Sequence, residues 1–239
     1  MQIFGVDTSV RSEQLELMDD VSLQGEELEK CLRELSFINT SLGGVHPTVS
    51  GVFALLPEDC KRFTLLDIGT GSADLPRHIV KEARRRGIEV RITAIDLSDT
   101  TIATAKKMCS GFPEIELRRV NLFDLPASEP FDIVHAALLL HHFSIAEAPR
   151  ALRKMYELSR YGVVLNDLHR HIVAWLGIRI LTQAFSRNRF IRNDGPLSVL
   201  RAFSRDDLER MAAGNGMPAP ELKWLPMFRW RALFRKAGG

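Results

Sequence analysis

LLDIGTGSAD, residues 65–74, is the stretch that decides the fold. An apolar run ends here in two glycines, Gly69 and Gly71, and a helical pattern follows through Arg86. This succession predicts a strand, a tight turn and a helix. Because glycine has no side chain, both residues suit a turn that a ligand approaches closely. The turn is therefore a candidate nucleotide site, although any α/β protein can use such a turn between a strand and a helix.

Two acids accompany the glycine turn. A second apolar run, residues 90–95, ends in Asp96, about 25 residues after the glycines. A carboxylate at this point can accept hydrogen bonds from both hydroxyls of a nucleoside ribose. The turn itself begins with an acid, Asp67, and its third small position is Ala73 instead of glycine. The pattern predicts a nucleotide site at the ends of two neighbouring strands.

With these residues the chain resembles the class I S-adenosylmethionine-dependent methyltransferases. In that family the first motif is an acid followed by Gly-x-Gly, and the second is an acid that ends the next strand. The resemblance implies S-adenosylmethionine as the cofactor. It implies that Asp67 organises the turn and that Gly69 and Gly71 make room for the methionine portion. It also implies that Asp96 holds the ribose, with Leu97 beside it.

The adenine contact is expected after a third predicted strand, residues 115–120, where the chain reads NLFDLP. The resembled family usually has an acid and a small residue at this junction, which places Asn121 and Leu122 beside the adenine. The amide oxygen of Asn121 could replace the acid, and Asp124 is the alternative. Ala137, at the end of the following predicted strand, completes the cofactor-binding residues that the resemblance implies.

The segment FDIVHAALLLHHF, residues 131–143, predicts a buried strand and then a loop at its carboxyl end, where ligands bind in parallel sheets. Its LHHFS stretch resembles the Leu-His-Asp-Trp-Ser stretch of plant and bacterial O-methyltransferases, whose histidine is a general base on a phenolic hydroxyl. The resemblance assigns this catalytic role to His141, and His142 takes the place of an acid. Neutral imidazole can accept such a proton. A purely structural histidine that bonds the backbone stays the alternative.

A further predicted strand, residues 161–165, ends in Asn166 and Asp167. The carboxylate of Asp167 could orient His141 or hold the acceptor, but a cap on the following helix is an equal alternative. A metal site needs three or four converging ligands. Because the sequence offers no convincing set, no metal is expected.

Helical segments flank the predicted sheet. Residues 24–41 carry apolar side chains at helical spacing, and a second short helix is expected up to about residue 56. We interpret residues 1–60 as an N-terminal helical lid over the substrate, a placement that the resemblance implies. Packing against the edge of the sheet is the alternative.

Residues 61–239 are expected to form the methyltransferase domain, with an insertion at residues 169–203. The insertion is predicted as an apolar helix, residues 171–185, followed by a polar loop around Gly195 and Pro196. It either lines an acceptor pocket or packs in the core. Near the C-terminus, aromatic and basic residues alternate on both sides of Pro226, which predicts an antiparallel hairpin.

The fold class that we predict is α/β: a doubly wound, seven-stranded Rossmann-like sheet with an N-terminal helical lid and a C-terminal antiparallel hairpin. The 239 residues, 45% of them hydrophobic, can bury one large core. A net charge of +2 gives no reason to expect nucleic acid as a partner. No signal-peptide pattern or stretch long enough for stable membrane insertion is visible. Three scattered cysteines fit a cytoplasmic location, and a homodimer stays open.

The predicted function is methyl transfer from S-adenosylmethionine to a small-molecule acceptor, a hydroxyl of an aromatic or polyketide-like natural product of secondary metabolism. A nicotinamide-dependent oxidoreductase is one alternative, because Gly-x-Gly with a distant acid describes that site as well. However, the chain has no recognisable Tyr-x-x-x-Lys pair for hydride transfer. The other alternative is a non-catalytic binding protein, suggested by the departures at Ala73 and Asn121.

Overall fold

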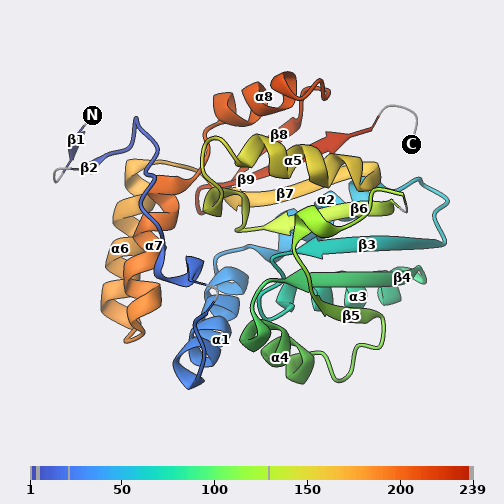
Figure 1. Cartoon of the computed structure of the whole chain (residues 1–239), viewed down its shortest axis with the longest axis horizontal. Coiled ribbons are helices and arrows are strands. Elements are labelled where there is room, and N and C mark those ends of the chain that lie inside the picture. The colour runs from blue at the N-terminus through green and yellow to red at the C-terminus, as the bar shows by residue number, and fades with distance from the viewer. Residues whose placement is uncertain (1, 4–5, 21, 129, 237–239) are drawn as a thin grey trace.

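A seven-stranded sheet forms the centre of the computed structural model, which describes residues 2–3, 6–20, 22–128 and 130–236 (Figure 1). Its strands are β3 (Arg62–Ile68), β4 (Glu89–Asp96), β5 (Ile115–Arg119), β6 (Phe131–Ala137), β7 (Ser159–Leu168), β8 (Glu221–Leu225) and β9 (Arg229–Arg235). They lie in the order β5-β4-β3-β6-β7-β9-β8. The first five are parallel, and β9 runs antiparallel to both β7 and β8. The predicted seven-stranded sheet and the C-terminal hairpin are therefore confirmed.

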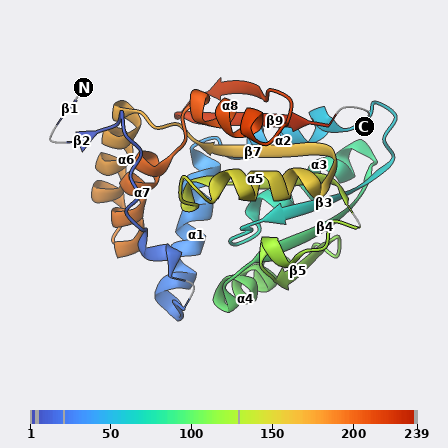
Figure 2. The same ribbon diagram turned by 45° about the horizontal axis from the view of Figure 1, so that its top comes forward.

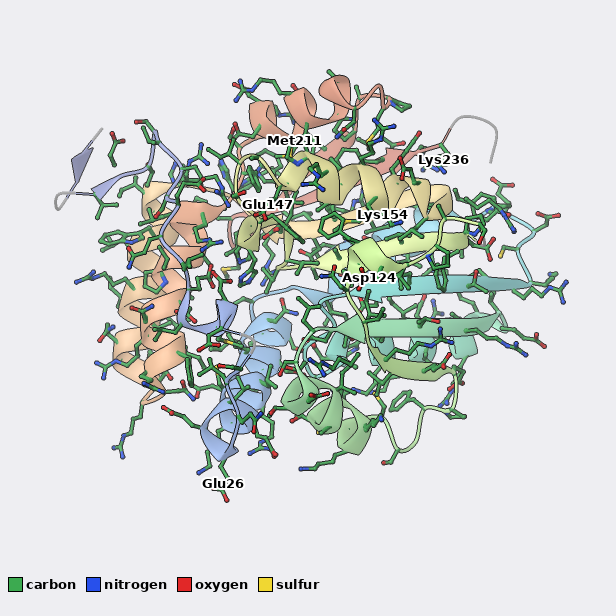
Figure 3. The ribbon with its side chains drawn as sticks, in the orientation of Figure 1. Glu26, Asp124, Glu147, Lys154, Met211 and Lys236 are labelled. Atoms are coloured by element: carbon green, nitrogen blue, oxygen red, sulfur yellow. The ribbon has the colours of Figure 1, made fainter. Side chains whose placement is uncertain are left out.

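Helices cover both faces of this sheet (Figure 1). The α-helices are α1 (Glu26–Ser41), α2 (Val45–Leu55), α3 (Asp74–Arg86), α4 (Asp99–Met108), α5 (Ala148–Glu157), α6 (Ile172–Phe185), α7 (Arg189–Arg201) and α8 (Arg205–Gly214). Helices α5 and α8 share one apolar core with the sheet, and α2, α3 and α4 share the core of the opposite face. Figure 3 labels Glu147 just before α5 and Met211 on α8. No helix in the described part of the chain is long and apolar enough to span a bilayer.

The direction of winding reverses at β3. Strand β3 pairs with β4 on one side and with β6 on the other. In open parallel sheets, ligands bind outside the carboxyl ends of the strands at such a reversal. The glycine turn after β3 and the loop after β6 both lie at this point.

The helices beside this edge come from two distant parts of the chain. Helices α6 and α7 stand together at one end of the sheet, and the N-terminal segment runs along them to α1 (Figures 1 and 2). A 3-10 turn of this segment, η1 (Leu17–Asp19), contacts α7. The predicted lid, residues 1–60, therefore divides: α2 packs on α3 and on the sheet, whereas η1 and α1 lie next to the carboxyl ends of the strands. The lid role of this second part stays a prediction.

The predicted loop around Gly195 and Pro196 is wrong, because both residues lie inside the 13-residue helix α7. An internal proline costs a helix about 3 kcal/mol, since it removes a hydrogen bond and crowds the preceding turn. Helix α7 nevertheless buries Phe190, Ile191 and Leu197. Burial of its apolar side chains against its neighbours thus outweighs the local preference.

Strand β7 contains a bulge where it pairs with β6. The register shifts so that Phe131 faces Ser159 but Ile133 faces Gly162, which places one extra residue on β7. Gly162 has a φ of +148°, and a Cβ atom there would lie 2.3 Å from the carbonyl oxygen of Phe234. Only glycine fits this position without moving β9.

We expect the substitution Gly162→Ala to lower the free energy of unfolding by at least about 2 kcal/mol, from backbone strain and the clash with β9. Gly177→Ala is the matched control, because an added Cβ at this helical position in α6 meets nothing within 4 Å. It should raise the free energy of unfolding by about 0.5–1 kcal/mol. Urea denaturation followed by circular dichroism measures both. Equal changes in the free energy of unfolding for the two variants would contradict the requirement for glycine at position 162.

Candidate functional site

A cavity of about 980 Å³ opens at the carboxyl ends of β3, β4 and β6. The nine site residues predicted from sequence all line it: Asp67, Gly69, Gly71, Asp96, Leu97, Asn121, Leu122, Ala137 and His141. Its opposite walls come mainly from η1, α1, α6 and α7, and the hairpin of β8 and β9 adds Met227, Phe228 and Arg229. The cavity therefore has a sheet side, which carries the predicted residues, and a helical side made of the N-terminal segment and the insertion.

The glycine turn leads the chain from β3 into α3 through left-handed backbone conformations. Gly69 and Gly71 have φ angles of +66° and +55°, and a Cβ atom at Gly69 would approach Leu139 to 2.7 Å. Ala73 adopts the same left-handed region with a φ of +55°, at the N-cap of α3. The turn is tied to β4 because the backbone N–H of Thr70 donates to the carbonyl of Ile95 at 3.0 Å.

Asp96 lies beside this turn at the end of β4. Its Oδ2 accepts a hydrogen bond from the Gly71 backbone N–H at 3.2 Å, and its Oδ1 accepts one from the Ser98 backbone N–H at 3.1 Å. Burial raises the pKa of Asp96, while these backbone hydrogen bonds act in the opposite direction. A carboxylate has about four acceptor sites. Asp96 can therefore hold the turn and still accept hydrogen bonds from a ligand in the cavity.

Asp67 points at a residue that sequence reasoning did not single out. Asp67 on β3 and His135 on β6 are partners in register, and Oδ1 of Asp67 lies 2.5 Å from Nδ1 of His135. The other ring nitrogen of His135 lies 2.9 Å from the hydroxyl oxygen of Thr48 in α2. All three side chains are buried. Asp67 thus fixes the base of the glycine turn to the neighbouring strand and, through His135, to α2.

The hydrogen bonds continue from Thr48 to the C-terminal hairpin. The side-chain amide of Asn166 donates to the Thr48 hydroxyl at 3.0 Å, and Arg229 donates to the Asn166 carbonyl oxygen at 3.3 Å. Arg229 also donates to the side chain of Asn39 in α1 at 2.8 Å, and Asn39 donates to Asp74 at 3.3 Å. Burial lowers the pKa of Arg229 to about 10. The buried chain of hydrogen bonds therefore joins the sheet, the hairpin, α1 and the start of α3.

His141 lies in a 3-10 turn, η3 (Leu140–His142), just after β6. Its Nδ1 lies 2.6 Å from Oδ1 of Asp167 at the end of β7, and its backbone N–H donates to Oδ2 of the same carboxylate at 3.3 Å. Burial by itself would raise the pKa of Asp167, but the charge and hydrogen bond of His141 hold it below its ordinary value. Asp167 therefore orients His141, the first of the three roles that the sequence left open, and leaves Nε2 as the free ring nitrogen.

The N-terminal segment brings Glu16 to that free nitrogen. Oε1 of Glu16 lies 3.7 Å from Nε2 of His141, and Oε2 accepts a hydrogen bond from the Ser198 hydroxyl at 2.8 Å. Burial raises the pKa of Glu16 to about 7. Neighbouring His142 is oriented by Asp19, with 2.5 Å between Nδ1 and Oδ1. Sequence reasoning missed both acids, because residues 1–20 show no helical or strand periodicity that marks them.

Two buried arginines hold this loop and the N-terminal segment together. Arg201 donates to the carbonyl oxygens of His141 and His142 at 3.0 and 2.6 Å, and to the carboxylate of Asp19 at 2.9 Å. Arg11 donates to the carbonyl oxygen of His141 at 2.7 Å. These charged hydrogen bonds fix the backbone of the histidine pair from the side away from the sheet.

At the end of the cavity where the adenine is expected, the residues predicted from sequence are an amide and two leucines, without a charged pair. Oδ1 of Asn121 accepts a hydrogen bond from the Phe123 backbone N–H at 3.0 Å and caps the 3-10 turn η2 (Leu122–Asp124). Leu122 is buried and Leu97 is exposed. Asp124, labelled in Figure 3, is not among the described residues that line the cavity. The structure therefore favours Asn121 over Asp124 for a contact with a ligand.

The comparisons with known proteins agree with this geometry. Residues 65–162 match the family model described as a methyltransferase domain. Residues 65–162, about two fifths of the chain, are therefore similar to a methyltransferase domain. The match favours this activity over the oxidoreductase alternative. The matched residues include the glycine turn, Asp96 and the histidine pair.

Similar proteins include enzymes of polyketide synthesis and small-molecule methyltransferases. A non-reducing polyketide synthase, Preu3 from Preussia isomera, is 31% identical over 161 residues, which are 65% of this chain but only 6% of that protein. An O-methyltransferase family protein from Burkholderia thailandensis has a TM-score of 0.66 at 16% identity and covers 96% of this chain and 66% of its own. Human N-acetylserotonin methyltransferase in complex with SAM has a TM-score of 0.60 at 16% identity, covering 89% and 57%. These two likenesses establish the shared fold.

Proposed function

We propose that the protein transfers the methyl group of S-adenosylmethionine to a hydroxyl of an aromatic or polyketide-like natural product. One observation carries this proposal: the glycine turn, Asp96 and His141, whose ring is oriented by Asp167, face a single cavity of about 980 Å³. Such a cavity is large enough for a cofactor and a small acceptor together. The similarity to part of a polyketide synthase supports the class of acceptor.

The sheet side of the cavity suits S-adenosylmethionine. A Cβ atom at Gly71 would meet nothing within 4 Å, so the backbone there borders open space that a ligand can enter. The free lone pairs of Asp96 would accept hydrogen bonds from the ribose hydroxyls, and Asn121 and Leu122 would border the adenine. Once bound, the cofactor supplies an electrophilic methyl group. Gly69, Leu97 and Ala137 would complete this side.

The His141–Asp167 pair would remove the proton of the acceptor. Because the Asp167 carboxylate can only accept a hydrogen bond, it keeps the proton of neutral His141 on Nδ1. Nε2 then carries the free lone pair, and the hydroxyl proton passes to it as the acceptor oxygen becomes a nucleophile. His141 would thus be the general base, and Asp167 would orient it and stabilise the charged ring.

We further propose that η1, α1 and the insertion close over the acceptor. Cys31 in α1 packs against Phe190 and Ile191 of α7, and this small apolar cluster is separate from the two cores of the sheet. The apolar packing of α1 against α7 is therefore separate from the packing of the sheet. Elements with such limited packing open at lower free energy than a domain core does.

Binding of S-adenosylhomocysteine tests the cofactor site. We expect Asp96→Ala to weaken binding about 10- to 150-fold, the loss of charged hydrogen bonds worth about 1.5–3 kcal/mol. Asp99→Ala is the control, because Asp99 is exposed and pairs only with Arg119 among the described residues. Isothermal titration calorimetry measures both variants. If Asp96→Ala binds as tightly as the unchanged protein, the ribose contact is wrong.

Turnover of the His141→Gln variant tests the general base. With the phenolic acceptor that gives the highest rate in a screen, we expect kcat to fall about 10²- to 10⁴-fold while S-adenosylhomocysteine affinity is kept. His46→Gln, an exposed change in α2, should leave kcat unchanged. Unchanged turnover in His141→Gln would remove this residue from the mechanism. NMR of the product decides the acceptor atom, and a methyl group on carbon would contradict the hydroxyl.

Alkylation of Cys31 tests the lid. Burial raises the pKa of the Cys31 thiol to about 12, so iodoacetamide reacts with it only when α1 moves away from α7. We expect S-adenosylhomocysteine and acceptor together to slow this reaction at least about tenfold by favouring the closed state. Cys109, buried in the core beside α4, is the control and should label only on unfolding. Labelling of both cysteines at one rate would contradict a separate lid.

A further inference from the structure

Glu16, His141 and His142 form a cluster of side chains that could bind a metal ion. The proposed methyl transfer does not require such an ion. Ligand-type atoms of the three side chains lie within 4.8 Å of one another. Nε2 of His141 is 3.7 Å from Oε1 of Glu16, and Nε2 of His142 is 3.9 Å from Oε2. We propose that this Glu16–His141–His142 cluster binds a divalent transition-metal ion.

Both imidazole rings are held in the orientation that a metal site requires. Nδ1 of His141 meets Asp167 at 2.6 Å, and Nδ1 of His142 meets Asp19 at 2.5 Å. A carboxylate accepts but does not donate, so each neutral ring carries its proton on Nδ1 and offers the lone pair of Nε2. Carboxylates that orient ligating histidines in this way are the usual partners around protein zinc. The two free lone pairs lie on the side where Glu16 sits.

The ligand set and its spacing suit zinc. Two histidines and one glutamate, with a fourth position left open, are the protein ligands of a common class of zinc sites. At zinc–ligand distances of about 2.0–2.1 Å, tetrahedral ligand atoms lie roughly 3.3 Å apart. The observed 3.7 and 3.9 Å end on the two different oxygens of Glu16, and the three ligand atoms lie within 4.8 Å of one another, so the side chains must move inward to close around an ion. Imidazole ligands favour zinc and its neighbours over Mg²⁺ and Ca²⁺, which prefer oxygen.

The burial of Glu16 supports a cation site independently of the ligand spacing. Glu16 is 5% exposed, and among the described residues its Oε1 accepts no hydrogen bond. A buried carboxylate oxygen without a partner is costly unless a cation compensates it. Asp19 and Asp167 bring negative charge to the cluster, and Glu16, with a pKa of about 7, adds a further charge when it is ionised. Arg201 lies 3.7 Å from Oε1 of Glu16 and 2.9 Å from the carboxylate of Asp19. A divalent ion would offset the remaining charge.

Among the described residues, a second histidine pair, His169 and His171, lacks the carboxylates that accompany the Glu16–His141–His142 cluster. The ring centroids of His169 and His171 are 5.7 Å apart. However, Nδ1 of His169 accepts a hydrogen bond from Trp224, and Nδ1 of His171 accepts one from the Val173 backbone N–H. These rings are oriented by donors, and no described carboxylate forms a third ligand with them. They are therefore a matched control for the cluster.

Metal binding has one consequence that rests on the proposed base role of His141. A nitrogen that holds a metal ion has no lone pair left for a proton, so the ion and the acceptor proton compete for Nε2. Zinc should then inhibit methyl transfer. The binding of the ion itself depends on neither donor nor acceptor, and its measurement is independent of the proposed function.

The experiment is a zinc-binding measurement on the tag-free chain, stripped with chelator. Equilibrium dialysis with elemental analysis should find one high-affinity equivalent of Zn²⁺ per chain, and excess Mg²⁺ should not displace it. Glu16→Gln and His142→Asn should each weaken binding at least about 100-fold, and Asp19→Asn about 10- to 100-fold through the loss of ring orientation. The double variant His169→Asn with His171→Asn should bind as the unchanged chain does.

Three results would overturn the proposal: less than one equivalent in the unchanged chain, binding in Glu16→Gln and His142→Asn that is as tight as in the unchanged chain, or loss of binding in the His169/His171 double variant. Circular dichroism of the metal-free variants controls for folding. Co²⁺ provides a readout that needs no substitution, since coordination by these ligands gives a visible absorption that excess Zn²⁺ abolishes. A chain that binds zinc but is not inhibited by it would contradict the base role of His141 and leave the metal site standing.

Discussion

The buried carboxylate of Asp67 is the constraint on which the carboxyl edge of the sheet depends. It can lie in the core only because His135 meets it from the next strand, and the hydrogen bonds then run through Thr48 and Asn166 to Arg229. Removing one partner from a buried pair of this kind typically costs about 3–5 kcal/mol, since the other is left unpaired. The glycine turn, α2 and the C-terminal hairpin are thereby held in one fixed arrangement, which gives the cavity a rigid floor.

The helical side of the cavity is held by a different principle. Its parts come from the first twenty residues, from α1 and from the insertion. Arg11 of the first part and Arg201 of the insertion meet at the carbonyl groups of the histidine loop. Arg201 satisfies those carbonyl groups and the carboxylate of Asp19 with one rigid, planar group. The same contacts bring Glu16 to His141, so the part of the cavity around His141 is completed by a segment that is remote in sequence.

His141 connects the two sides. Asp167 of the sheet fixes one ring nitrogen, while the other meets the N-terminal segment. The proton removal and the metal binding that we propose would both use this second nitrogen, and each would need the first one to be oriented by a carboxylate. The chemistry of the site therefore depends on which group approaches Nε2. Access to this nitrogen is bordered by η1, α1 and the insertion, the elements that we expect to move.

The sequence alone determined the sheet, the glycine turn, the two acids and His141, because each depends on a local pattern: apolar runs, small residues at a turn, and a polar residue at the end of a strand. The tertiary structure decided the rest. Gly195 and Pro196 read locally as a break, but burial of Phe190 and Leu197 made the segment a helix. Glu16, Asp19 and Arg201 carry no local pattern at all. They are brought to His141 only by the packing of remote segments, where buried charges must find partners.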